Sequence, residues 1–165
     1  MRRVGPAPRA ALLALGLGVA ALLAACGDGE ERRIRRALAE IRGLAAKAPG
    51  ESELAGLATA RKIALHFTDP VSVTAEPVGL ATRDRRGLIG AIHQYRSRTD
   101  ALYVRTYDEE LELDPAGGRA RMTLTVEFVR ELADLAGAER YAVVLYWVRG
   151  DGEWLVEAAE VRRSG

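Results

Sequence analysis

Two histidines and one aspartate are the residues of this sequence best suited to acid–base chemistry. His66 and His93 are the only histidines among 165 residues, and an imidazole exchanges its proton near neutral pH, as a general acid or base must. We take His93, Asp69 and His66 as catalytic candidates, although they match no known catalytic set. Each has a structural alternative: a polar position on an amphipathic helix for the histidines, and for Asp69, which precedes Pro70, a turn that ends a helix.

A second group of residues is suited to binding an anion. Tyr103, Arg105 and Tyr107 alternate along one segment and would share one face of a strand, while Tyr95 precedes them on an expected helix. Aromatic rings that flank a guanidinium can hold a negatively charged ligand, so these four residues are the ligand-binding candidates. The alternative is that the tyrosines pack at a rim and that Arg105 pairs across strands with an acid such as Glu127.

The only cysteine, Cys26, follows an apolar leader. Residues 10–25 carry no charge, and the nine residues before them include three arginines, which is the pattern of a signal peptide. The apolar run is shorter than the roughly 20 residues that a membrane-spanning helix needs. Its end, Leu23-Ala24-Ala25-Cys26, resembles a bacterial lipobox, which implies cleavage before Cys26 and a lipid on its thiol. The alternative is an ordinary free thiol.

These features predict the organisation and location of the chain. Residues 1–25 are expected to be a cleaved signal peptide, 26–29 the lipidated cysteine with a short tether, and 30–165 one domain. The lipid would hold the protein to a membrane of the cell envelope, on the periplasmic side in a cell with two membranes. Four arginines close to the anchor would orient the domain on an anionic surface, opposed by nearby acids: Arg32, Arg33, Arg35 and Arg36. The alternative is that they form an ordinary polar helix face.

Several chemistries lack the residues that they need. The sequence has no zinc-type set of cysteines and histidines, no phosphate-binding glycine loop and no Gly-x-Ser-x-Gly motif. We therefore expect no metal and no cofactor. The formal net charge is +1 and becomes −2 when residues 1–25 are removed. Because no strongly basic stripe remains, nucleic acid is not expected as a partner.

Helical periodicity precedes alternating periodicity along the mature chain. The first helix is expected from the Asp28 to Glu31 capping box up to Pro49-Gly50, and the second from Ser52 to Asp69-Pro70. A short β-branched strand, 71–74, follows. The third helix is expected at 84–96, with its apolar face interrupted by two glycines.

Four long strands are expected after residue 101. They cover 102–113, 120–128, 141–149 and 154–161, and the last two are joined by Asp151-Gly152, a pair that favours a two-residue type I′ turn. The segment 130–139 could continue the strands or form a protruding loop. The fold class is therefore α+β: three N-terminal helices on a strongly curved mixed or antiparallel sheet of four long strands and one short one.

The order of these elements resembles the nuclear transport factor 2-like (NTF2-like) superfamily, which includes the SnoaL-like cyclases. The closing hairpin 146–156, with Trp147 and Trp154 on either side of its turn, carries the resemblance. It implies a cone-shaped fold with an apolar pocket between helices and sheet. We expect a non-catalytic domain that binds a small apolar ligand or a protein. The alternatives are a lyase or isomerase that uses an acid–base residue in the pocket, and a purely structural role.

The residues 141–148 are apolar on both faces of their strand. Three helices can cover only one face of a sheet, so another surface must cover the second. The sequence predicts a homodimer through the outer face of the sheet. The alternative is that 130–139 folds back over this face.

Overall fold

The computed structural model describes residues 29–130 and 138–164. The first helix, residues 29–45, carries Ile34 and Leu38 on its buried face, as its apolar spacing predicts. It ends before Pro49 and Gly50, which form a turn. Asp28, the proposed first residue of the capping box, lies outside the described residues.

The second helix, α2 (Glu53–Ala64), begins where Ser52 accepts a hydrogen bond from the backbone of Ala55. The expectation that this helix continues to Asp69 is wrong. Strand β1 (Phe67–Ala75) already begins at Phe67, so Asp69 and Pro70 lie in a strand and do not end a helix. Phe67 fits the helical spacing of its apolar neighbours, but it is the first residue of β1, and its side chain is buried there.

The third helix, α3 (Arg85–Ser97), confirms the expected segment. Asp84 is its N-cap and accepts a hydrogen bond of 2.7 Å from the backbone of Gly87. Leu88 and Arg96 are the buried residues of this helix. A buried arginine is unusual, because a guanidinium must find partners for its donors when it leaves water.

One mixed sheet contains six strands in the order β2-β1-β6-β5-β4-β3. The four long strands are confirmed, and their bounds are β3 (Tyr103–Leu113), β4 (Arg119–Val129), β5 (Glu139–Gly150) and β6 (Glu153–Arg163). Two expectations need correction. β1 has nine residues, and the loop after it contains a short 3-10 helix, η1 (Glu76–Val78), and a sixth strand, β2 (Leu80–Thr82). β1 pairs in parallel with β6, and all other neighbours are antiparallel.

The turn between β5 and β6 has the geometry that its residues favour. Asp151 and Gly152 have φ values of 43° and 89°, and a type I′ turn needs positive φ at both of its central residues. The two strands pair without a register shift next to this turn, from Val148 opposite Leu155 to Gly150 opposite Glu153.

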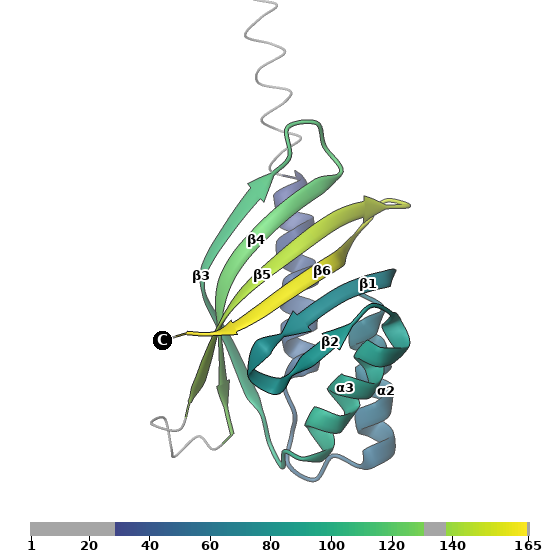
Figure 1. The fold of residues 1–165 in the computed structure, drawn as a ribbon, viewed down its shortest axis with the longest axis vertical. Helices are drawn as coiled ribbons and strands as arrows, with labels where there is room; N and C mark the ends of the chain where they lie inside the picture. The colour runs from purple at the N-terminus through teal and green to yellow at the C-terminus, as the bar shows by residue number, and fades with distance from the viewer. Residues whose placement is uncertain (1–28, 131–137, 165) are drawn as a thin grey trace, which may run out of the picture.

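Figure 1 shows the first helix behind the sheet, with α2 and α3 beside β1 and β2. The sheet face toward the first helix holds the apolar residues of β4, β5 and β6, which pack on Ile34 and Leu38. Trp147, Met122 and Val156 have no exposed surface. The space between helix and sheet is therefore filled by side chains in its central part.

Candidate functional site

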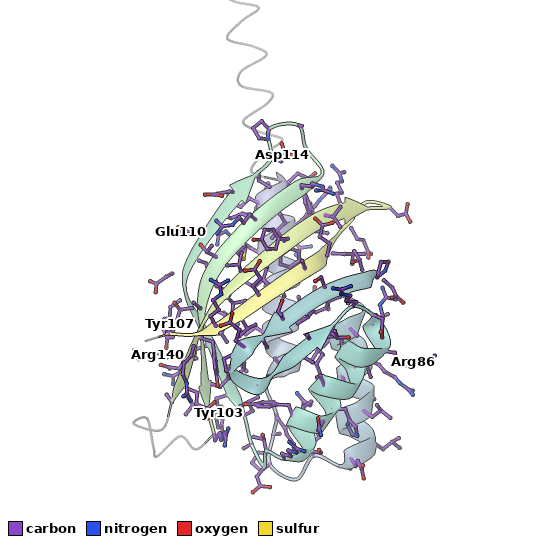
Figure 2. The ribbon with its side chains drawn as sticks, in the orientation of Figure 1. Arg86, Tyr103, Tyr107, Glu110, Asp114 and Arg140 are labelled. Carbon is purple, nitrogen blue, oxygen red and sulfur yellow. The ribbon has the colours of Figure 1, made fainter. Side chains whose placement is uncertain are left out.

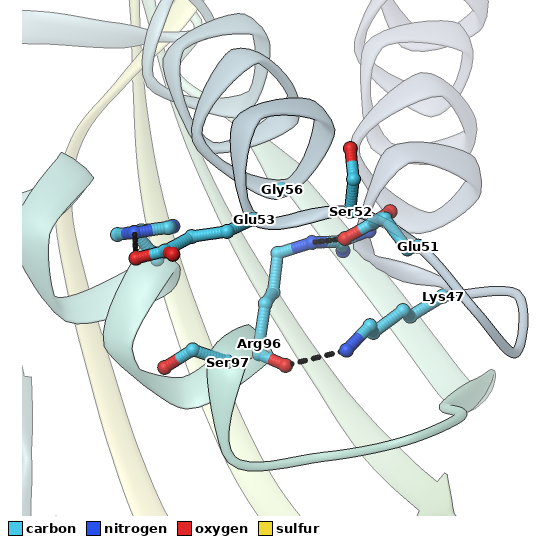
Figure 3. A pocket seen from close by; sticks show the side chains of 8 residues that line it. Lys47, Glu51, Ser52, Glu53, Gly56, Arg96 and Ser97 are labelled. Carbon is cyan, nitrogen blue, oxygen red and sulfur yellow. Dashed lines mark hydrogen bonds and ion pairs between the residues drawn. The ribbon is translucent and has the colours of Figure 1, made fainter.

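The hollow that contains His93 lies where the start of α2 meets the end of α3 (Figure 3). Its volume is about 350 Å³ and its lining is largely polar. His93 Nε2 is 3.8 Å from Glu53 Oε1, while Nδ1 is buried and has no hydrogen-bond partner. Glu53 is largely exposed to solvent, so this pair places one histidine beside one solvated carboxylate.

Arg96 dominates the same hollow, and its role there is structural. Its Nη2 lies 2.5 Å from Glu51 Oε2, and its Nε donates to Glu51 Oε1. Nη1 donates to the carbonyls of Leu44 and Ala45 at 3.0 Å each. The last carbonyls of a helix have no partners within the helix, so this guanidinium caps the first helix and joins it to α3.

Lys47 adds a second bond between the same segments. Its ammonium donates to the carbonyl of Arg96 at 2.7 Å and to that of Thr99. The bonds of Arg96 and Lys47 thus hold the first helix, Glu51 before α2, and α3 together around His93. We call these bonds the clasp. Both cations of the hollow are engaged in it.

A second hollow, which we call the amphipathic groove, lies between the first helix, the end of α2 and the β5–β6 turn. Its volume is about 530 Å³. Charged side chains from both helices and from the turn line it together with apolar ones; the residues that define it here are Arg33, Arg36, Glu40, Lys62, Leu65, His66, Glu153 and Leu155.

His66 follows α2 and takes part in this groove. Its Nε2 is 3.9 Å from Glu40 Oε2 on the first helix, and its backbone carbonyl accepts a hydrogen bond from Val156. His66 and His93 therefore lie in different hollows and cannot act on one substrate.

Tyr95 lies on α3 and packs against the face of the sheet that the helices cover. Its ring centroid is 6.1 Å from that of Phe128, which is 5.7 Å from that of Tyr141. The hydroxyl of Tyr141 donates to Glu139. Burial, together with the nearby Glu139 carboxylate, raises the pKa of Tyr141 to about 12, and burial also raises the pKa of Tyr95.

The other three ligand candidates lie on the opposite face. Tyr103, Arg105 and Tyr107 point away from the helices, because their β4 partners Val129, Glu127 and Thr125 alternate with the inward residues. Figure 2 labels Tyr103 and Tyr107 along the lower part of β3. The expected grouping of Tyr95 with these residues is wrong, since the sheet separates them.

Arg105 pairs with Glu127, which was the structural alternative. The ion pair measures 3.9 Å, and Tyr107 Oη donates to the same carboxylate at 3.2 Å. Arg140 of β5 donates from Nε at 2.8 Å. This hydrogen bond holds the pKa of Glu127 below its usual value, against the opposing effect of burial. The carboxylate already occupies the place that an anionic ligand would take beside Arg105.

Asp69 has a local structural partner. Its Oδ1 accepts from the backbone of Arg85 at 3.5 Å, at the start of α3. Arg85 in turn donates to the carbonyl of Phe67 at 2.7 Å. Asp69 thus helps to hold β1 against α3.

Within 29–130 and 138–164, no group of three or more histidine, cysteine, aspartate or glutamate side chains could hold a metal ion. In the same ranges, no helix is long and apolar enough to cross a membrane. Cys26 lies outside the described residues.

Solved structures provide the comparison for this architecture. An NTF2-like protein from Novosphingobium aromaticivorans superposes with a TM-score of 0.64 at 17% identity, covering 88% of this chain and 87% of the other. The chain has an NTF2-like fold. A provisionally named scytalone dehydratase from the same organism gives a TM-score of 0.66 at 12% identity, covering 84% and 87%. An NTF2-like protein of unknown function from Pseudomonas aeruginosa gives 0.58 at 18%, covering 82% and 98%.

These similarities concern the NTF2-like fold alone. Sequence comparison finds no matching protein family and no matching curated protein.

The sequence did not predict the residues that organise the hollow around His93 or the contact between Tyr141 and Glu139. Arg96 and Glu51 looked like ordinary charges in the sequence. In the structure, a Cβ added to Gly56 would lie 3.0 Å from Glu51 Oε1, so α2 and the Glu51 side chain approach closely there. Tyr141 appeared in an apolar strand, and Glu139 in a segment assigned to no element. The pairing of Tyr141 with Glu139 depends on where β5 begins, which periodicity did not show.

Proposed function

We propose that this chain is a lipid-anchored, non-catalytic NTF2-like binding domain of the cell envelope. The observation that carries the proposal is where the fold leaves space for a ligand. The centre of the cone is packed by Trp147, Met122 and Ile34, which have no exposed surface, whereas the amphipathic groove is open. An open groove lined by both apolar and charged side chains suits binding better than chemistry that requires exclusion of water.

The anchor is supported by the lipobox-like end of the leader and by the start of the fold. The first helix is already formed at residue 29, three residues after Cys26. A lipid on Cys26 would therefore place this helix at the membrane surface.

The experiment that tests the anchor is expression of the full chain and of Cys26→Ala in a bacterial host. We expect the natural chain in the membrane fraction, with an N-terminal cysteine whose mass includes acyl chains. C26A should keep its leader and carry no lipid. An unmodified Cys26 on membrane-bound protein would refute the anchor.

The alternative function, a lyase or isomerase, is favoured by one observation. Tyr141 lies next to Glu139 and near Tyr95 on the inward face, and its pKa of about 12 keeps it protonated at neutral pH. If it turns from Glu139, to which it donates in the structure, this hydroxyl can donate to a developing oxyanion. Hydrogen–deuterium exchange next to the carbonyl of cyclic ketones would test this role. Exchange that Tyr141→Phe abolishes would support an enzyme, and exchange no faster than the buffer rate would reject it.

A further inference from the structure

The rim of the amphipathic groove carries two cations without partners. Arg33 pairs with Glu30 at 3.3 Å, and Arg35 pairs with Glu31 and Glu109. Arg36 and Lys62, in contrast, are exposed and have no ion pair or hydrogen bond to any residue that the structure describes. Positive charge from the first helix and from α2 thus converges on one opening, where the lining also holds two acids, Glu40 and Glu153.

Exposed apolar surface lies beside these cations. Leu65, the C-cap of α2, is 65% exposed, and it lines the groove with Leu44 and Leu155. A large aliphatic side chain at a helix end, next to unpaired basic groups, complements a molecule that has an anionic head and an apolar body.

The groove also lies close to the proposed lipid attachment. Arg36 comes seven residues after the first described residue of its helix, which is a rise of about 10 Å. The three residues from Cys26 to Asp28 can span about 10 Å at most. The rim is therefore within roughly 20 Å of the anchored cysteine, a distance over which a tethered domain can reach the bilayer that holds it.

We propose that the amphipathic groove docks an anionic phospholipid of the membrane to which the chain is anchored. Arg36 and Lys62 bind the phosphate of the headgroup, and Leu65 contacts the start of the acyl chains. Glu153, an acid of the lining that has no partner among the described residues, limits the affinity. This inference rests on the proposed function for the anchor only. It names the ligand that the groove binds.

The lipidated protein in vesicles allows a direct test. Because Cys26 is the only cysteine and its thiol carries the lipid, a cysteine introduced elsewhere can be labelled alone. A nitroxide at Leu65→Cys reports on the groove. The matched control is Leu54→Cys, at the other end of α2, where the side chain is 78% exposed. In vesicles of phosphatidylcholine with phosphatidylglycerol, we expect the label at 65 to contact lipid and the label at 54 to contact water. In pure phosphatidylcholine both should contact water.

Charge variants then test the two cations. Each of Arg36→Gln and Lys62→Gln should lower the ratio of lipid-contacting to water-contacting label at 65 about 5-fold, and the double variant about 30-fold. Glu153→Gln should raise it. The control is Arg83→Gln with Arg86→Gln, which removes the same charge from exposed positions at the start of α3.

Two results would overturn the docking proposal: equal lipid contact at residue 65 in both kinds of vesicle, or an equal loss in the R36Q/K62Q and R83Q/R86Q proteins. The latter would mean that only net charge matters. Failure of the anchor is distinguishable from both, because a protein without lipid on Cys26 would not remain with the vesicles at all.

Discussion

Arg96 is the residue on which the helical part of the fold depends most. Its side chain is 4% exposed and bonds both Glu51 and the last carbonyls of the first helix. Replacing Arg96 with Ala leaves the partly buried Glu51 carboxylate, which is 15% exposed, and several carbonyls without this partner. We expect the free energy of unfolding to fall by about 3–5 kcal/mol, measured by urea denaturation.

The control for Arg96→Ala is Arg86→Ala, on the exposed side of the same helix (Figure 2). Its effect should stay within about 0.5 kcal/mol. A loss below 1 kcal/mol for R96A would mean that water replaces the clasp at little cost.

Tyr141 makes the stability of the protein sensitive to high pH. Its pKa is about 12 in the fold and about 10 in an unfolded chain. Above pH 10 the unfolded state releases a proton that the folded state keeps, so stability is constant below pH 10 and falls between pH 10 and 12. The expected loss is about 2–3 kcal/mol. Denaturation curves from pH 8 to 12 should show this slope, and Tyr141→Phe should remove the part due to Tyr141 and leave the contribution of Tyr95, whose pKa is also raised.

For single residues, the sequence predicted one cross-strand ion pair correctly but did not predict which residues lie together in a candidate ligand site. The pairing of Arg105 with Glu127 follows from strand alternation and was foreseen. The separation of Tyr95 from Tyr103 was not, because the face of a strand relative to a preceding helix depends on register, which local spacing does not contain.

The β5–β6 turn shows how strictly an element depends on backbone conformation. Gly152 has a φ of 89°, which strains any residue with a Cβ, whereas the neighbouring Gly150 has no positive φ and open space around it. Gly152→Ala should lower the free energy of unfolding by about 1–2 kcal/mol. Gly150→Ala should leave it unchanged or raise it, since alanine restricts the unfolded chain. Thermal unfolding of both variants checks the prediction, and equal melting temperatures would contradict it.

Most elements were predictable because their periods are clear, and the exceptions have physical causes. The start of β1 was missed because Phe67 satisfies a helical spacing and a strand position equally well. Strand β2 has three residues, too few for any period to appear. The bulge of β3, where Asp108 has a φ of 53°, shifts the register between Tyr107 and Glu110, which alternation alone does not reveal.

The outer face of the sheet bears on how whole molecules associate. We propose that two copies pair through this face, where Val144, Tyr146 and Val148 are half-buried and Ala142 is exposed. Tyr146 Oη lies 3.3 Å from Glu160 Oε1. The alternative cover is the segment 130–139, of which 131–137 lie outside the described residues.

Sedimentation of residues 27–165 separates a dimer from a monomer. We expect a dimer at micromolar concentrations that Tyr146→Glu dissociates, because a charge would be buried at the interface. Leu54→Glu, on an exposed position of α2, is the control and should leave the dimer intact. A monomer at high micromolar concentration would refute the proposal.

The place of β6 in the sheet determines when this molecule can fold. Among the strands of the described residues β6 comes last in the sequence, yet it lies between β1 and β5 and provides the link from the β1–β2 pair to the other long strands. Synthesis therefore delivers the central strand last, and the sheet stays in two parts until residues 153–163 have emerged. Pairing across such a long separation is slow. A chain with this strand order leaves the edges of β1 and β5 unpaired for longest, until β6 is available to join them.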